Sequence, residues 1–278
     1  DAEKEVEEGE GGDKEYEEED EEGEGKEGTV QERVVEAIRR GFLLDERHAS
    51  QLQENLGGSL ARLAEDLYRE QHHFVFELLQ NADDATYPPG VEPEFKLILE
   101  EKQLVALSNE RGFSEQDVRA LCSVNRSTKP QLSDGCERIG RKGIGFKSVF
   151  KISDSPTIHS GPWHFAFNAK LASSWGADLK GLGYIVPQWM GSADKQHRDW
   201  TTEVRLAFRP RMDDEERACL QKDLQALDGA LLLNLNRLRS IHLVERARSQ
   251  VRSSTLYRED IGENLVRIYS GKQHCDWL

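Results

Sequence analysis

Long apolar runs, paired cysteines and an excess of basic residues are all missing from this sequence of 278 residues. No window approaches the roughly 18 to 20 uninterrupted apolar residues of a membrane span, and the acidic N-terminus is unlike a secretory signal. The four cysteines form no CxxC or Cys/His cluster, which argues against a zinc site or a disulfide framework. We therefore expect an intracellular protein of the cytoplasm or nucleus, with reduced thiols and no membrane partner.

The formal charge of −15 disfavours a broad nucleic-acid surface, but it is unevenly distributed. Residues 1–28 contain 16 acids and three lysines, and their apolar side chains are limited to Ala2, Val6 and Tyr16. Such a segment cannot bury enough surface to offset the entropy of ordering, which predicts a disordered acidic tail. The remaining 250 residues are nearly neutral and have an ordinary globular composition. The abrupt start and end of the chain suggest a fragment of a longer protein.

Hydrophobic periodicity indicates an α+β fold. We expect a two-layer sandwich in which helices cover a mixed, mostly antiparallel sheet. A domain over residues 29–245 would follow the tail, and residues 246–278 would begin a further, truncated segment. The expected helices span residues 30–42, 59–85, 114–121, 145–152 and 213–227. The expected strands span residues 95–100, 104–108, 157–159, 163–167, 183–186, 203–208 and 238–244.

A polar face on the second helix is the first candidate for chemistry. Glu77, Asn81 and Asp84 are spaced i, i+4 and i+7, so they project from one side of the helix. A carboxylate beside an amide oxygen suits Mg²⁺ and leaves the carboxylate free to orient an attacking water. A solvated face of an amphipathic helix is the alternative interpretation.

A glycine-rich segment is the second candidate. Gly140, Gly143 and Gly145 form a GxxGxG pattern ahead of an apolar helical stretch, and Arg141, Lys142 and Lys147 concentrate positive charge around it. Glycines let backbone amides approach phosphates, and the following helix start adds a positive dipole end. The pattern fits neither a Rossmann turn nor a Walker loop. A flexible surface loop is the alternative.

The order of the motifs adds information that no single motif carries. The chain reads ELLQNADDA at 77–85, NERGF at 109–113, STK at 127–129, IGRKGIGFKS at 139–148 and TTEVRL at 201–206. In this order the segments resemble the GHKL ATPases, with the Bergerat fold of DNA gyrase, MutL, histidine kinases and HSP90-like chaperones. The likeness is strongest to the sacsin and NO VEIN group of chaperone-like domains and covers about residues 55–245.

The resemblance implies roles for individual residues. Glu77 would orient water onto the γ-phosphate, Asn81 would bind Mg²⁺, and Asp84 would help to hold the pocket. Asn109 is placed where the superfamily has the adenine-binding aspartate of DxGxG, which leaves base selectivity open because an amide can also donate. Gly112 would pass under the base. Ser127, Thr128 and Lys129 would belong to a lid, and Thr202 would reach the adenine side, unless it is an ordinary strand residue. Gly140, Gly143 and Gly145 would cradle the phosphates, and the rest of the nucleotide-binding segment would be Arg141, Lys142, Ile144, Phe146 and Lys147.

The sequence therefore predicts an ATP-binding domain that hydrolyses ATP slowly, with ATP and Mg²⁺ as ligands and lid closure over the phosphates as its conformational step. An unidentified protein client or partner domain is expected, and nucleotide-dependent dimerisation is open. A non-catalytic nucleotide-binding or protein-interaction module is the alternative, with the acidic tail as a docking arm. A histidine kinase is less consistent with the sequence, because neither His72 nor His73 begins a recognisable phosphoacceptor hairpin.

Overall fold

The structure of the chain, a computed structural model, describes residues 28–42, 59, 73–123, 145–170, 181–247, 250–262, 265–271 and 273–277. The predicted tail, the first part of the second helix and most of the glycine-rich segment lie outside these ranges. No helix within them is long and apolar enough to cross a membrane.

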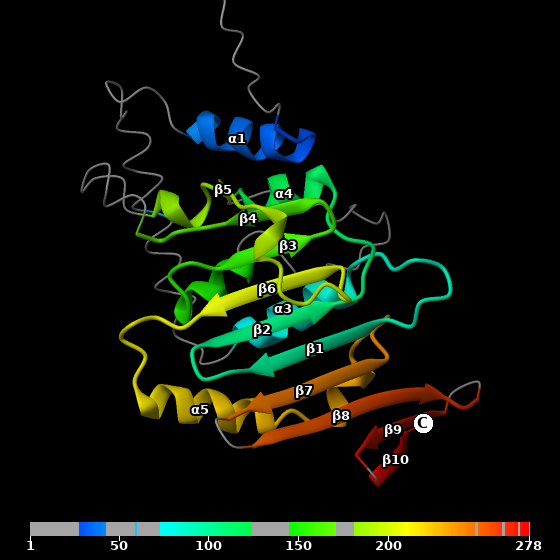
Figure 1. Ribbon diagram of the computed structural model, residues 1–278. Coiled ribbons are helices and arrows are strands. Elements are labelled where there is room, and N and C mark those ends of the chain that lie inside the picture. Colours follow the sequence, from blue (N-terminus) through cyan, green and yellow to red (C-terminus); the bar gives the residue numbers. More distant parts are fainter. Residues whose placement is uncertain are drawn as a thin grey trace, which may run out of the picture.

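The described strands form one mixed sheet in the order β10-β9-β8-β7-β1-β2-β6-β3-β4-β5 (Figure 1). Its central ladder, between β1 and β7, is parallel, and the other pairings are antiparallel. This confirms the expected α+β class. The strands are β1 (Glu94–Leu99), β2 (Gln103–Ser108), β3 (Thr157–Ser160), β4 (Trp163–Ala166), β5 (Gln188–Trp189), β6 (Thr202–Ala207), β7 (Ser240–Arg246), β8 (Val251–Asp260), β9 (Val266–Ser270) and β10 (Gln273–Trp277).

The helices agree well with the expected pattern. α4, expected over residues 114–121, begins with a capping box, in which the Ser114 hydroxyl accepts from the Asp117 amide and the Asp117 carboxylate accepts from the Ser114 amide. The helix expected from Gly145 is a 3-10 helix, η1. The helices are α1 (Val30–Phe42), α3 (His73–Asp83), α4 (Glu115–Leu121), η1 (Gly145–Lys151), η4 (Leu182–Tyr184), η5 (Ser192–Asp194), α5 (Asp214–Gln225) and η6 (Gly229–Leu233).

Two expectations about strands were wrong. Residues 183–186 contain no strand: residues 183 and 184 belong to η4, and the apolar side chains of Leu182 and Ile185 are buried from this turn. The strand expected to be the last, β7, is followed by β8, β9 and β10, which continue the same sheet. Their exposed, polar residues hid them from a search for alternating apolar positions.

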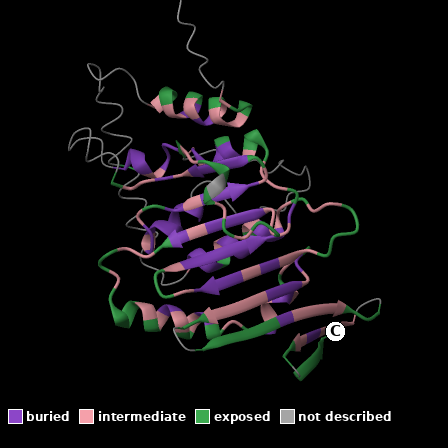
Figure 2. Ribbon diagram, viewed as in Figure 1, coloured by how far each residue is buried: buried purple, intermediate pink, exposed green. Residues whose placement is uncertain are grey.

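The centre of the sheet is buried on both faces (Figure 2). Leu97, Leu104 and Ala106 belong to the main core beneath α3 and η1. On the opposite face, Ile98, Val105 and Leu107 form a smaller cluster that Trp200 covers. In Figure 1, α3 lies behind β2 and β6, so its C-terminal end stands over the middle of the sheet. The cavity described next opens at that position.

Candidate functional site

A cavity of about 740 Å³ lies between the C-terminal end of α3, the middle strands, α4 and η1. This is a size typical of small-molecule sites. Its lining comes from segments that are far apart in the sequence: Leu78, Asn81–Thr86, Phe95, Ala106–Ser108, Glu110, Gly112, Phe113, Gln116, Asp117, Ala120, Leu121, Phe146, Thr202, Val204, Asn236 and Arg237.

Five of the predicted site residues line this cavity. Asn81 and Asp84 contribute from the α3 end, as the shared helix face predicted. Gly112, Phe146 and Thr202 contribute from the β2–α4 turn, from η1 and from the start of β6. The fold therefore brings together residues that the sequence analysis connected by motif order alone.

Glu77 lies beside the cavity lining and in contact with Gly145. A Cβ atom placed on Gly145 would lie 1.9 Å from Glu77 Oε2, so a side chain at position 145 would collide with the carboxylate. The other oxygen, Glu77 Oε1, is 3.2 Å from His73 Nε2, one helical turn earlier. The predicted water-orienting residue and the last glycine of the GxxGxG pattern thus touch directly, next to Phe146.

In the turn after β2, the cavity is lined by Glu110, which was not predicted, and not by Asn109, which was. Asn109 lies outside the cavity lining, since its Oδ1 accepts from the Glu94 amide at 2.9 Å and its Nδ2 donates to the Glu92 carbonyl at 2.8 Å. Glu110 lines the cavity and is 6% exposed. It also stands two residues before Gly112, which is the spacing of the aspartate in DxGxG. Counting back from Gly112 would have selected Glu110 from the sequence.

Thr202 is held by a short chain of polar contacts. Its Oγ1 is 2.6 Å from Ser160 Oγ, and Ser160 Oγ accepts from the Phe113 amide at 2.9 Å. Gly112 has a φ of +100°, and a Cβ on it would come within 3.3 Å of the Gly161 nitrogen and the Thr201 methyl carbon. Glycine is favoured here by both the left-handed backbone and the close approach. These contacts fix the end of the cavity where Glu110 lies.

Lys147 takes a different position from the one expected. It is buried, its ammonium donates to the carbonyl of Leu121 at the end of α4, and it lies 4.5 Å from the centre of the Phe167 ring. Burial lowers its pKa to about 8. Lys147 is absent from the cavity lining, so its ammonium interacts with the C-terminal end of α4 and with the Phe167 ring and does not face a ligand.

Asp83, next to Asp84 in the ELLQNADDA motif, binds the backbone of a distant segment of the chain. Its buried carboxylate accepts from the backbone amides of Asn236, Arg237 and Leu238 at 2.7 to 2.9 Å. This ties the segment before β7 to α3 and places Arg237 at the cavity wall, where its Nη1 donates to the Ala85 carbonyl at 2.9 Å. No sequence signal links these positions, which are more than 150 residues apart.

The charge of the described walls is mainly negative. Four carboxylates line the cavity, from Asp83, Asp84, Glu110 and Asp117, against the guanidinium of Arg237. Within the described ranges no group of three or more His, Cys, Asp or Glu side chains could hold a metal ion. The remaining predicted site residues, Ser127, Thr128, Lys129, Gly140, Arg141, Lys142, Gly143 and Ile144, lie outside the described residues.

Comparison with known proteins gives consistent relatives. Residues 94–173 match the Sacsin domain family. The chain is 35% identical over 252 residues to Protein NO VEIN of Arabidopsis thaliana, and the aligned region covers 85% of this chain and 8% of that protein. It is 32% identical over 107 residues to human Sacsin, covering 34% of this chain and 2% of that protein. The chain thus spans a small part of both relatives, and its similarity to them supports a place in the sacsin and NO VEIN group.

Proposed function

We propose that this chain is an ATP-binding domain of the GHKL type that hydrolyses ATP slowly and works in a chaperone-like protein. The observation that supports this best is that Asn81, Asp84, Gly112, Phe146 and Thr202 line the same cavity. These residues come from four of the motifs that carry the resemblance. Coincidental surface patterns would have no reason to meet at one cavity.

The negative charge of the described walls bears on the ligand. A nucleoside triphosphate is itself an anion, so it needs cations to enter a cavity lined mainly by carboxylates. Magnesium, when bound, would neutralise the phosphates and would take an oxygen ligand from Asn81, which lines the cavity. The predicted contacts of Lys129, Arg141 and Lys142 would add the remaining positive charge. The donor set fits a magnesium ion shared with phosphates, since Mg²⁺ in such sites uses few protein ligands.

Glu77 is the residue that would orient the attacking water. Its carboxylate lies against Gly145, so a phosphate held by the backbone at that glycine would be within reach of it. The contact with His73 gives the carboxylate a second neighbour that fixes its direction. In this arrangement Glu77 acts on hydrolysis, whereas Asn81 and Asp84 act on binding.

Glu110 replaces Asn109 in our proposal for the base contact. A carboxylate accepts hydrogen bonds without donating, and the exocyclic amine of adenine is a donor. Both polar side-chain atoms of Asn109 are already engaged by backbone groups of residues 92 and 94. A preference for adenine would therefore depend on Glu110.

ATP binding and turnover by the whole chain test this function. Calorimetry with Mg²⁺ and ATP should give a saturable binding isotherm, and radiolabelled ATP should be hydrolysed at a low rate. Glu77→Gln should keep binding and lose hydrolysis, whereas Glu115→Gln, which alters an exposed carboxylate on α4, should change neither. Absence of ATP binding to the unaltered chain would refute the proposal. Equal background hydrolysis by all three proteins, with binding intact, would instead indicate a binding module without catalysis.

A further inference from the structure

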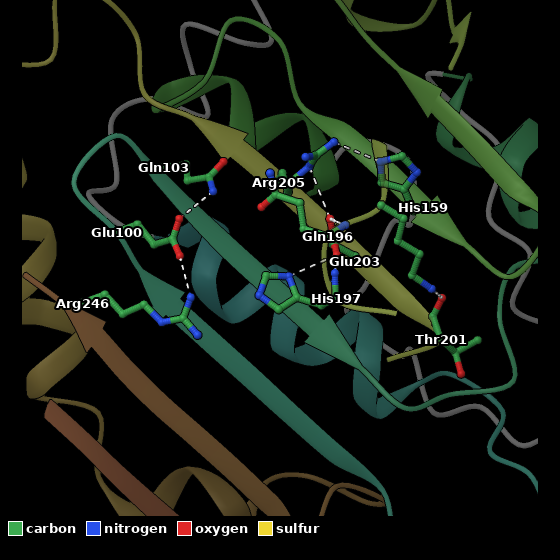
Figure 3. Close-up of polar contacts among 10 residues, drawn as sticks. Glu100, Gln103, His159, Gln196, His197, Thr201, Glu203, Arg205 and Arg246 are labelled. Carbon is green, nitrogen blue, oxygen red and sulfur yellow. Dashed lines mark hydrogen bonds and ion pairs between the residues drawn. The ribbon is translucent and has the colours of Figure 1, made fainter. Parts of the chain in front are cut away.

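A second polar cluster lies on the sheet face opposite the α3 side, beneath the loop of residues 190–201 (Figure 3). The loop joins β5 to β6. Trp200, near its end, packs against Ile98, Val105 and Leu107, and Lys96 Nζ lies 5.8 Å from the centre of the Trp200 ring. Glu203 and Arg205, which hold this loop in place, belong to the TTEVRL segment at 201–206, but the motif comparison assigned a role to Thr202 alone.

Glu203 is the centre of the cluster. It follows Thr202 on β6, so its side chain points to the opposite face of the sheet from the cavity, and it is fully buried. Its Oε2 accepts from the His197 amide at 2.6 Å and lies 3.1 Å from His197 Nδ1. Its Oε1 accepts from the Gln196 amide at 3.2 Å and lies 3.3 Å from Arg205 Nε. Burial of a carboxylate is costly unless it is paired and hydrogen-bonded, and Glu203 meets both conditions.

The rest of the cluster holds Arg205 in place. Its Nη2 is 3.1 Å from His159 Nε2, and because a guanidinium can only donate, this nitrogen of His159 is the acceptor. The proton of His159 is therefore on Nδ1 and points to Nδ1 of His164 at 3.0 Å. Burial, followed by the charge of Arg205, lowers the pKa of His159 to about 4. The two histidines are neutral spacers, and the charges that remain are those of Glu203 and Arg205.

The loop connects this cluster to the cavity through Thr201. The Thr201 carbonyl accepts from Lys195 Nζ at 2.9 Å, within the loop, and from the Gly161 amide at 3.2 Å, in the turn between β3 and β4. The Thr201 methyl group faces Gly112 at close approach. The neighbouring Ser160 accepts from the Phe113 amide. One continuous set of contacts therefore runs from the carboxylate of Glu203 to the turn that closes one end of the cavity.

We propose that Glu203 is a positioning residue for the ligand site: by holding residues 196–201 of the loop, it fixes the Gly112–Phe113 turn from the opposite face of the sheet. The identity of the ligand rests on the proposed function, because the adenine base would lie at the Gly112 turn. The effect of Glu203 on the position of this turn does not depend on any ligand. The effect on the turn and the effect on ligand affinity can therefore be measured separately.

Residue-resolved amide hydrogen exchange of the ligand-free chain tests the geometric part. Glu203→Gln keeps the shape of the side chain and removes its charge, which weakens charge-assisted hydrogen bonds to a neutral level. We expect about tenfold faster exchange at the Gln196 and His197 amides and a faster rate at Phe113 as well. Amides of β8 should keep their rates, which shows that the variant is folded. Faster exchange at Gln196 and His197 with an unchanged rate at Phe113 would overturn the inference.

Glu100→Gln is a matched control for the charge change. Glu100 is another carboxylate in Figure 3, where it accepts from Gln103 Nε2 at 2.7 Å and from Arg246 Nη1 at 3.0 Å, and neither partner belongs to the loop. This variant should leave all three amides unchanged. Thr201→Ser is a milder second variant, since it removes only the methyl group that faces Gly112. It should accelerate exchange at Phe113 but not at Gln196 or His197, and an unchanged Phe113 rate would count against the inference.

Nucleotide affinity provides the functional readout. With Mg²⁺ and ATP, Glu203→Gln should raise the dissociation constant about tenfold and Glu100→Gln should leave it within about twofold, where one decade corresponds to 1.4 kcal/mol. If the unaltered chain binds no ATP, the proposed function fails while the exchange rates still decide the role of Glu203. If ATP binds equally to all variants, the proposed function stands and Glu203 does not position the site.

Discussion

The two adjacent aspartates of the ELLQNADDA motif should behave in opposite ways when each is replaced by alanine. Both carboxylates line the cavity, but Asp83 is buried and accepts three backbone hydrogen bonds from residues 236–238, whereas Asp84 is half-buried. We expect Asp83→Ala to lower the free energy of unfolding substantially and Asp84→Ala to act mainly on ligand binding. The pair differs by one position, so each variant is the control for the other.

The size of the Asp83 effect follows from its partners. A hydrogen bond to a charged group contributes about 1.5 to 3 kcal/mol net, but removing the acceptor does not cost three times that amount. Asn236 and Arg237 are exposed, so water can replace the carboxylate at their amides. Leu238 is fully buried, and its amide would lose its partner at a cost of about 1 to 3 kcal/mol. Together we expect a loss of about 3 kcal/mol, within the range for breaking a buried network.

Urea denaturation at equilibrium measures this loss directly, and for a domain of this size it corresponds to a fall of about 6 to 12 °C in Tm. Asp84→Ala should stay within about 1 kcal/mol of the unaltered chain, as do most changes away from buried networks. The reasoning is refuted if Asp83→Ala is equally stable, because the segment before β7 would then be held without the carboxylate.

Three further predictions concern the cavity and its surroundings. Glu110→Ala should weaken ATP binding about tenfold or more. Asn109→Ala should change ATP affinity less and should lower stability, because the side-chain amide of Asn109 hydrogen-bonds to the backbone at the start of β1. Calorimetry and denaturation of the two variants distinguish the roles. Gly145→Ala should displace the Glu77 carboxylate, because the new methyl group would lie 1.9 Å from Oε2. Hydrolysis of ATP should fall at least tenfold while the fold is retained. Normal turnover by this variant would contradict the contact between Glu77 and Gly145. Lys147→Met should change the pH dependence of stability. The folded chain releases the Lys147 proton near pH 8 and the unfolded chain near 10.5, so stability from this group rises with pH between these values. Burial raises the pKa of Cys122 to about 12, which works in the opposite direction above pH 9. The difference between Lys147→Met and the unaltered chain between pH 8 and 9 isolates the lysine, and parallel stability curves would argue against its burial as a cation.

Local patterns in the sequence were sufficient for most helices and for the β1–β2 hairpin. The Ser114 capping box and the alternating apolar residues of β1 and β2 act over a few positions, so they are readable without the fold. The positions of β8, β9 and β10 were missed because their register is set by the strand beside them, and most of β8 and all of β10 lack a buried face.

The candidate site was predictable where its residues sit on a motif and unpredictable where distant segments meet. Asn81, Asp84, Gly112 and Thr202 were named from the sequence, and they line the cavity. Lys147 was expected at the phosphates because it is cationic and follows the glycines, but its side chain runs to the end of α4. Arg237 reaches the wall through the backbone contacts of Asp83, which depend on a pairing that no local pattern encodes.

The parallel ladder between β1 and β7 has a consequence for how the chain acquires its structure. It pairs Glu94–Leu99 with Ser240–Glu245, so the sheet becomes continuous only after nearly 150 residues of intervening chain are available. The contacts of Asp83 with residues 236–238 close over the same interval. Pairings at such large sequence separation slow folding. During synthesis, β1, β2, β3, β4 and β6 can assemble before β7 is available. The cavity gains its Arg237 wall only with the segment before β7, so ligand binding should appear later than the folding of these strands.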